Sequence, residues 1–137
     1  MTGFKATPEV LEAILAKADE MLVSASRAVE TGAWGDAASR AYYAVFHAIS
    51  AVLATRGLSY SSHSQALGAF NREFVKTGVF APATTRQLQR LFEDRQIADY
   101  DWNRRLDEAT ARQDVADAAA VVAACRRFVR KRPDSPT

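Results

Sequence analysis

The stretch that decides the fold is DAASRAYYAVFHAISAVLATRG, residues 36–57 of the chain. Apolar side chains lie on nearly every side of a helix built from this segment, and Gly57 is a typical helix stop. A helix that is apolar almost all round is found in the middle of a bundle, because no face of it suits water. We therefore expect a central helix from about Asp36 to Arg56, covered by other helices.

Four further helices are expected around this one, because apolar residues recur every three or four positions between clear start and stop signals. These signals are, in chain order, a Thr7-Pro8-Glu9 start, Gly32, a Ser62-x-x-Gln65 capping box, Gly78, Pro82 followed by Thr84 or Thr85 as a cap, a Thr110-x-x-Gln113 capping box, and Pro133. No segment alternates apolar and polar residues as a half-buried strand would.

Composition also favours helices. The 137 residues include 27 alanines but only 6 glycines and 4 prolines, and alanine is the best helix former. The length suits one domain. We predict an all-α fold, a single domain over residues 1–137 that forms an up-and-down antiparallel bundle of four to five helices. Its core should span about residues 8–131, between short frayed ends.

Cysteine content and hydropathy exclude several classes of protein. A single cysteine, Cys125, allows neither an internal disulfide nor a cysteine-rich zinc site, and its apolar neighbours suggest a small core residue. No run of eighteen apolar residues is present, and Met1 to Lys5 do not begin a signal peptide. We therefore expect a cytoplasmic protein that does not contact a membrane.

The net charge of +2 is small, but it is unevenly placed. Five basic residues cluster near the end of the chain: Arg126, Arg127, Arg130, Lys131 and Arg132. One interpretation is a solvated helix end, where cations suit the negative pole of the helix dipole. The alternative is a phosphate-binding patch.

Polar residues on the central helix are candidate site residues. Arg40, Tyr43 and His47 are spaced so that they share one helix face. A buried Arg40 would need an acidic partner, and Asp99 and Asp101 are the candidates. One interpretation is a structural Arg40–Asp99 pair with tyrosines stacked around it. The other is a binding cleft, and the two can coexist.

Two histidines and two tryptophans complete the candidates. His47 is interpreted as a hydrogen-bonded core residue and His63 as a surface or capping residue, although either could be the base of an active site. Without a carboxylate pair at ligand spacing, the two histidines predict no metal site. Trp34 should cover one end of the bundle. Trp102 lies in an irregular segment and should be partly exposed, where it could stack on a base or a partner.

Four strings in the chain resemble the HEPN domain family, above all its small single-domain prokaryotic members. They are ASRAYYAVFHA at 38–48, SHS at 62–64, FVKTG at 74–78 and RQIADYD at 95–101, and the resemblance covers roughly residues 11–129. It implies a helical bundle that is often dimeric. It also implies action on RNA, because many members are metal-independent ribonucleases. These serve as toxins, often encoded beside a minimal nucleotidyltransferase that acts as antitoxin.

The catalytic motif of this family is altered here. Active members carry an arginine, four to six further residues and then a histidine near a dimer axis. Arg95 matches the arginine, but Tyr100 takes the place of the histidine. Trp102 takes the place of a tyrosine to which another enzyme can attach AMP. Arg95 can stabilise developing phosphorane charge, whereas a tyrosine, with an ordinary pKa of about 10, is a poor base. We therefore expect weak RNA cleavage or none.

Two hypotheses for function emerge. The first is an RNA-targeting toxin with Arg95, Tyr100 and Asp99 in its cleft, Arg40 and His47 behind them, and the basic C-terminal helix attracting RNA. The second is a non-catalytic protein that binds a nucleotide, RNA or a nucleotidyltransferase partner. Both expect a homodimer with Arg95 and Tyr100 near its two-fold axis, and both expect no cofactor.

Overall fold

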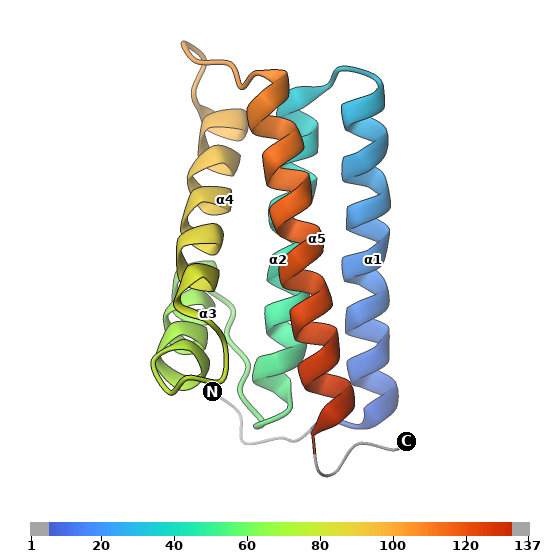
Figure 1. Ribbon diagram of the computed structural model, residues 1–137, viewed down its shortest axis with the longest axis vertical. Helices are drawn as coiled ribbons and strands as arrows, with labels where there is room; N and C mark the ends of the chain where they lie inside the picture. The colour runs from blue at the N-terminus through green and yellow to red at the C-terminus, as the bar shows by residue number, and fades with distance from the viewer. Residues whose placement is uncertain (1–5, 133–137) are drawn as a thin grey trace.

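The computed structural model describes residues 6–132, and all regular structure in that range is helical (Figure 1). The elements are α1 (Pro8–Glu30), α2 (Trp34–Ala54), α3 (His63–Phe70), the π-helical η1 (Asn71–Val75), α4 (Pro82–Tyr100) and α5 (Glu108–Lys131). The predicted all-α bundle is thus confirmed. The frayed ends expected before residue 6 and after residue 132, including the stop at Pro133, lie outside the described residues.

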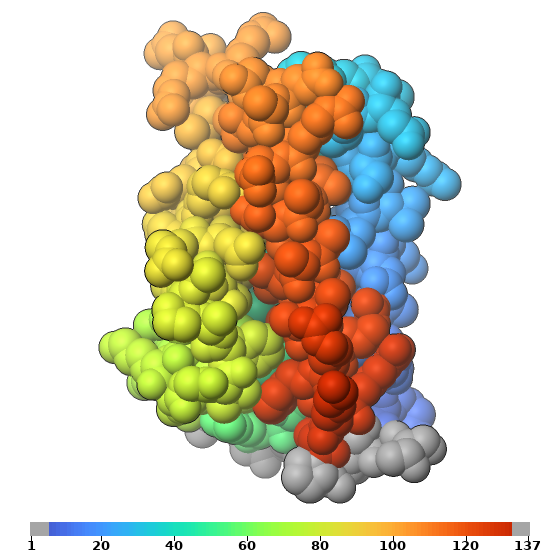
Figure 2. Space-filling model, in the orientation of Figure 1, coloured from blue at the N-terminus to red at the C-terminus, as the bar shows by residue number. Residues whose placement is uncertain are grey.

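The four long helices run up and down beside one another. Figure 1 shows α5 in front of α2, with α1 on one side and α4 on the other, and the short α3 beside the lower half of α4. In the space-filling view, α5 forms the front of the molecule between the α4 and α1 sides (Figure 2). No helix in the described range is long and apolar enough to span a membrane.

Helix α2 is the centre of the bundle, as its sequence predicts. It contacts α1, α3, α4 and α5. Its completely buried residues include Ala44, Val45, Ala48, Ile49 and Val52. The small alanine side chains let neighbouring helices approach the α2 backbone closely, while the larger residues fill the space between helices. This burial fixes which way the polar residues of α2 can point.

Several helix starts confirm the predicted capping signals. The Thr7 hydroxyl accepts a hydrogen bond from the Val10 amide at 3.2 Å. The Ser62 hydroxyl accepts one from the Gln65 amide at 3.3 Å. Each of these bonds satisfies an amide that has no partner inside the helix.

Two other predicted caps are wrong. Helix α4 is preceded by Ala81, which caps nothing with its side chain, and Thr84 and Thr85 already lie in the helix. Helix α5 begins earlier than predicted, because the Asp107 carboxylate accepts a hydrogen bond from the Thr110 amide at 2.8 Å. Aspartate is as good a cap as serine or asparagine. The helix therefore begins after Asp107, which lies three residues before the predicted cap Thr110.

The last turn of α4 carries charged and aromatic residues in place of an apolar face. Residues 99 and 100 do not fit an apolar helix pattern, yet α4 continues through Tyr100. The ion pair between Arg95 and Asp99, one turn apart, supports this last turn from its surface side. Asp101 then caps the helix in an extended conformation. As a result, Tyr100 is carried by the helix, and Trp102 by the loop that follows it.

Trp34 and Cys125 pack as predicted. Trp34 is half-buried against a small second core made by Ala28, Val29 and Ala37 with Ala111, at the end of the bundle where α1 meets α2. Cys125 is completely buried in the main core, and burial raises the pKa of its thiol to about 12. The thiol is therefore an apolar packing group.

A buried acidic cluster joins α4 to α5. Arg90 on α4 donates a hydrogen bond to Asp114 Oδ1 at 3.2 Å and also pairs with Asp117. Asp114 is completely buried, and both Asp114 and the nearby Asp94 have one buried carboxylate oxygen without a hydrogen-bond partner. Burial, reinforced by Asp94, raises the pKa of Asp114 to about 8, so this carboxyl keeps its proton at neutral pH.

Candidate functional site

The candidate site is centred on Arg95, near the C-terminal end of α4. Its Nε donates a hydrogen bond to Asp99 Oδ2 at 3.0 Å, one turn further along the same helix. Its Nη2 donates to Tyr43 Oη on α2 at 2.8 Å. The side chain is only 12% exposed. Two neighbouring helices therefore hold the guanidinium group in one orientation.

Aromatic rings surround this guanidinium. Its Cζ lies 5.4 Å from the ring centroid of Tyr42, 5.3 Å from that of Tyr43 and 5.6 Å from that of Tyr100. A cation at such distances is attracted by the ring faces. Burial alone lowers the pKa of Arg95, but the neighbouring Tyr43, Tyr100 and Asp99 raise it above its ordinary value. The positive charge is thus permanent.

His63 belongs to the same cluster, which its interpretation as a surface or capping residue missed. It stands at the first position of α3, and its Nδ1 is hydrogen-bonded to Tyr42 Oη at 3.0 Å. Its ring lies 4.1 Å from that of Phe46 and 5.8 Å from that of Tyr43, centroid to centroid. Burial, and then the charge of Arg95, lower the pKa of His63. The imidazole is therefore neutral at pH 7, with Nε2 free of hydrogen bonds to described residues.

Tyr42 is a site residue that the sequence analysis quoted but did not select. It is 1% exposed, and burial raises the pKa of its hydroxyl to about 12, so it stays protonated. Its ring contacts Arg95 and its hydroxyl orients His63. The signal that could have identified it is the tyrosine pair on an otherwise apolar helix. A buried tyrosine hydroxyl needs a partner, although the sequence does not show that His63 provides it.

The predicted Arg40–Asp99 pair is wrong. Arg40 is exposed, and its Nη1 donates to Ser24 Oγ on α1 at 2.7 Å. Arg40 and Tyr43 are neighbours on α2, but one side chain points toward α1 and the other toward α4. Because the helix has 3.6 residues per turn, a spacing of three rotates them by about 60° relative to each other. The partner of Asp99 is instead Arg95.

His47 has no hydrogen bond or ring contact with Arg95, Tyr42, Tyr43 or His63, although its ring lies 6.2 Å from that of Phe46, centroid to centroid, and the charge of His63 acts on it. His47 is half-buried, and the charges nearest to it include Lys17 and Glu20 on α1. Burial, and then Lys17, lower its pKa. It makes no hydrogen bond to another described residue, so its predicted role as a hydrogen-bonded tie between helices is wrong.

Two exposed aromatic residues lie at the end of α4 and in the loop after it, and the first of them, Tyr100, also contacts Arg95. Tyr100 is 66% exposed and Trp102 is 95% exposed, more than the partial exposure predicted for the tryptophan. Both line a shallow hollow of about 470 Å³, together with Asp101. The Asp101 carboxylate accepts a hydrogen bond from the Asn103 amide at 3.0 Å, which makes it a turn residue. Large rings in solvent beside a fixed cation offer surfaces for stacking or for a protein partner.

This arrangement can bind an anion and position it. Arg95 presents a fixed cation whose planar group suits phosphate oxygens. The Tyr43 hydroxyl accepts from Arg95, so its own proton is available to a ligand. His63 provides a neutral ring nitrogen in the same cluster. In the described part of the chain no three His, Cys, Asp or Glu residues are grouped so that they could hold a metal ion.

Comparison with known proteins shows which family the chain resembles over most of its length. The model of the HEPN domain family matches residues 11–129. A Thermotoga maritima protein named "UPF0332 protein" is 40% identical over 92 residues, which are 67% of this chain and 70% of that protein. The Methanocaldococcus jannaschii protein "Putative toxin MJ0605" is 31% identical over 100 residues, 73% of this chain and 75% of that protein.

A second protein from that archaeon, "Putative toxin MJ0142", is 31% identical over 91 residues, which are 66% of this chain and 62% of that protein. The family match spans every helix described above, from the first turn of α1 to the last turn of α5. It includes Arg95, Tyr42, Tyr43 and His63, the residues that build the site. The chain therefore belongs to the HEPN domain family.

Proposed function

We propose that this protein is the RNA-targeting member of a toxin-type module, and that it binds the RNA backbone at Arg95. The observation that carries this proposal is the way Arg95 is held. Asp99 and Tyr43 orient it, three aromatic rings surround it, and one of these rings, Tyr100, is exposed and lines a hollow together with the exposed Trp102. A fixed guanidinium beside exposed rings suits single-stranded RNA, which presents phosphates and unstacked bases together.

The relatives support the toxin context. Two archaeal relatives carry the word toxin in their names. The resemblance stated from the sequence extends this to RNA as the target and to a minimal nucleotidyltransferase as the partner. A toxin that binds RNA needs an attachment point for phosphate and a surface for an inhibitor. Arg95 and Trp102 provide these two features on neighbouring surfaces.

The chemistry available at the site favours binding over cleavage. A base must remove the 2′-hydroxyl proton, and Tyr100 replaces the histidine that performs this step in active family members. His63 is the one described residue in the cluster with a neutral nitrogen suited to accept a proton. Tyr42 holds His63 through the hydrogen bond to its Nδ1. His63 lies on α3, whereas the family's catalytic histidine would lie at position 100 on α4. Any residual cleavage in the absence of metal should therefore depend on both Arg95 and His63.

Assembly forms part of the same proposal. A tryptophan that is 95% exposed is unusual on a protein that works alone. Pairing two copies through Trp102 and Tyr100 would cover both rings and bring two Arg95 side chains to one cleft. This homodimer doubles the positive charge facing the RNA.

A second candidate is a non-catalytic protein that binds a nucleotide or a nucleotidyltransferase partner. The observation that favours it is the exposure of Trp102 combined with the absence of histidine at position 100. In that case the Arg95 cluster holds a single nucleotide, and the exposed rings contact a different protein.

An RNA-binding measurement tests the proposal. Fluorescence anisotropy of a labelled single-stranded RNA should show tight binding by the natural protein and at least tenfold weaker binding by Arg95→Gln. Arg40→Gln is the matched control, because it removes the same charge from an exposed arginine that contacts α1. Equal affinities for the natural protein and Arg95→Gln would contradict the proposal. Selective binding of free nucleotides but not RNA would favour the second candidate.

A further inference from the structure

A large hollow lies at the other end of the bundle from Tyr100. It has a volume of about 910 Å³ and is formed by the end of α2, the start of α4 and the end of α5. Val79, Phe80 and Ala81, just before α4, and Ala124 and Phe128 on α5 give it an apolar wall. Its volume falls in the range of small-molecule sites.

The charges around this hollow are all positive. Arg56, Arg127, Lys131 and Arg132 line it, and no acidic residue does. Arg56 is already engaged by Glu73, because its Nη1 donates to the Glu73 carbonyl at 3.2 Å and lies 3.9 Å from the Glu73 carboxylate. Arg127 and Lys131 form no ion pair with a described residue. Arg127 and Lys131 therefore lie beside an apolar wall without a carboxylate partner in the described part of the chain. This combination suits a ligand that joins an anionic group to a flat or apolar body.

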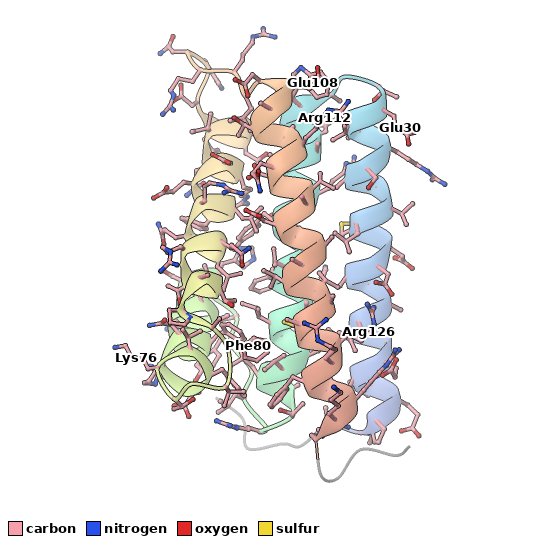
Figure 3. All side chains as sticks on the ribbon, in the orientation of Figure 1. Glu30, Lys76, Phe80, Glu108, Arg112 and Arg126 are labelled. Atoms are coloured by element: carbon pink, nitrogen blue, oxygen red, sulfur yellow. The ribbon has the colours of Figure 1, made fainter. Side chains whose placement is uncertain are left out.

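The structure divides the basic run of α5 into two groups. Arg126 pairs with Asp19 at 2.6 Å and Arg130 with Glu12 at 2.9 Å, both on α1. Arg127 and Lys131 line the hollow instead. Figure 3 shows this separation: Arg126 lies on the α1 side of α5, whereas Phe80 of the hollow lies on the α4 side. Only part of the run is thus a solvated, paired helix face.

Thr84 adds a hydrogen-bond donor to the hollow. Thr84, in the first turn of α4, is 8% exposed and lines the hollow, and its hydroxyl makes no hydrogen bond to another described residue. Ala81, the residue before α4, offers no side-chain acceptor to the helix start. The positive end of the helix dipole is therefore not neutralised by a capping side chain there.

We propose that this hollow binds a nucleoside phosphate, either a free nucleotide or the terminal nucleotide of an RNA chain. Arg127 and Lys131 hold the phosphate, with Arg56 and the Thr84 hydroxyl as further donors. The base packs against Phe128 and Val79. Arginine favours phosphate because its planar donors match the phosphate oxygens. The hollow is open to solvent, and its apolar wall lies beside Arg127 and Lys131. One compact ligand can therefore place a flat base on the wall and its phosphate at the two cations.

This site is separate from the Arg95 cluster and does not rest on the function proposed for it. Arg95 comes eleven residues after Thr84 on α4, a rise of about 16 Å along the helix axis. Loss of one site should therefore leave the other intact. If the ligand is the end of an RNA chain, the two sites would contact the same molecule at different points.

Isothermal titration calorimetry on the full chain tests the proposal, with guanosine 5′-monophosphate and inorganic phosphate as probes. Two further probes distinguish a free nucleotide from the terminal nucleotide of an RNA chain. They are a short single-stranded RNA with a 5′-phosphate and the same RNA with a 5′-hydroxyl. We expect the nucleotide to bind more tightly than phosphate alone. The double variant Arg127→Gln with Lys131→Gln should bind it at least tenfold more weakly. Arg126→Gln with Arg130→Gln removes equal charge from the same helix outside the hollow, and should change affinity less than twofold.

Each other outcome would overturn the proposal. Equal weakening by both double variants would mean general attraction by the basic helix and not a defined site. Loss of nucleotide binding in Arg95→Gln, with the hollow variants unaffected, would place the nucleotide in the other cluster. No binding of either phosphate probe would also refute it. Circular dichroism of each variant, unchanged from that of the natural protein, verifies that the bundle is intact.

Discussion

Replacing Tyr43 with phenylalanine tests whether the hydrogen bond from Arg95 to Tyr43 holds the guanidinium in place. This change removes only the hydroxyl that accepts the 2.8 Å hydrogen bond from Arg95 Nη2 and leaves the ring in place. The Tyr43→Phe variant keeps the ring contacts with Tyr42 and His63. It therefore isolates the contribution of one charge-assisted bond between α2 and α4.

The expected loss of stability can be worked from the geometry. A hydrogen bond to a charged group contributes about 1.5–3 kcal/mol. The Arg95 side chain is 12% exposed, so water can replace the lost acceptor only in part. Because Asp99 still holds the guanidinium, we expect a loss of about 1.5 kcal/mol in the free energy of unfolding. For a chain of this size that corresponds to a fall of about 5 °C in Tm.

Urea denaturation followed by circular dichroism measures this loss. Tyr60→Phe is the matched control, because Tyr60 is half-buried and its hydroxyl makes no hydrogen bond to another described residue. The control should change the free energy of unfolding by less than about 0.5 kcal/mol. If Tyr43→Phe is as stable as the control, the bond to Arg95 does not hold the guanidinium in place, and the reasoning on its fixed orientation is refuted.

Three further predictions concern protonation, catalysis and assembly. Burial and Asp94 raise the pKa of Asp114 to about 8, so the native state holds a proton that the unfolded chain loses near pH 4. The free energy of unfolding measured by urea titration should therefore fall as pH rises from about 4 to about 8. The Asp114→Asn variant should flatten that profile. A flat profile in the natural protein would contradict the buried, protonated carboxyl. Tyr100→His should create or increase RNA cleavage in EDTA, and addition of Arg95→Ala should abolish it; no gain would mean that a ring at position 100 does not reach the substrate. Sedimentation at tens of micromolar should show a dimer that Trp102→Ala weakens, whereas a monomeric natural protein would contradict the proposed assembly.

The helical bundle could be predicted because its signals are local. The alanine-rich segment 36–57 has no face suited to water, and the serine and threonine caps at Ser62 and Thr7 act within one turn. Helix ends were less predictable where two caps compete. Asp107 and Thr110 are both good capping residues, and which one begins α5 depends on how the preceding loop leaves α4.

The candidate site was only partly predictable, because it depends on contacts between helices. Arg95 and Tyr43 were selected from the sequence, but their mutual bond was not, since 52 positions separate them. Arg40 was assigned to the cleft because spacing on one helix does not show which neighbour each side chain faces. His63 was underestimated for the same reason, since its partner Tyr42 lies 21 positions away. Tertiary packing of α3 against α2 creates this part of the site.

The central claim is that RNA binds at the Arg95 cluster, and an NMR titration tests it most directly. Isotope-labelled protein is titrated with a single-stranded RNA that carries hydroxyl groups at both ends, so that the phosphate hollow between α2, α4 and α5 has no terminal phosphate to bind. We expect the largest shifts at Arg95, Tyr43, His63 and Tyr100, with little change on the α1 side of α5 near Arg126. Shifts confined to the basic face of α5, with the Arg95 cluster unchanged, would contradict the account.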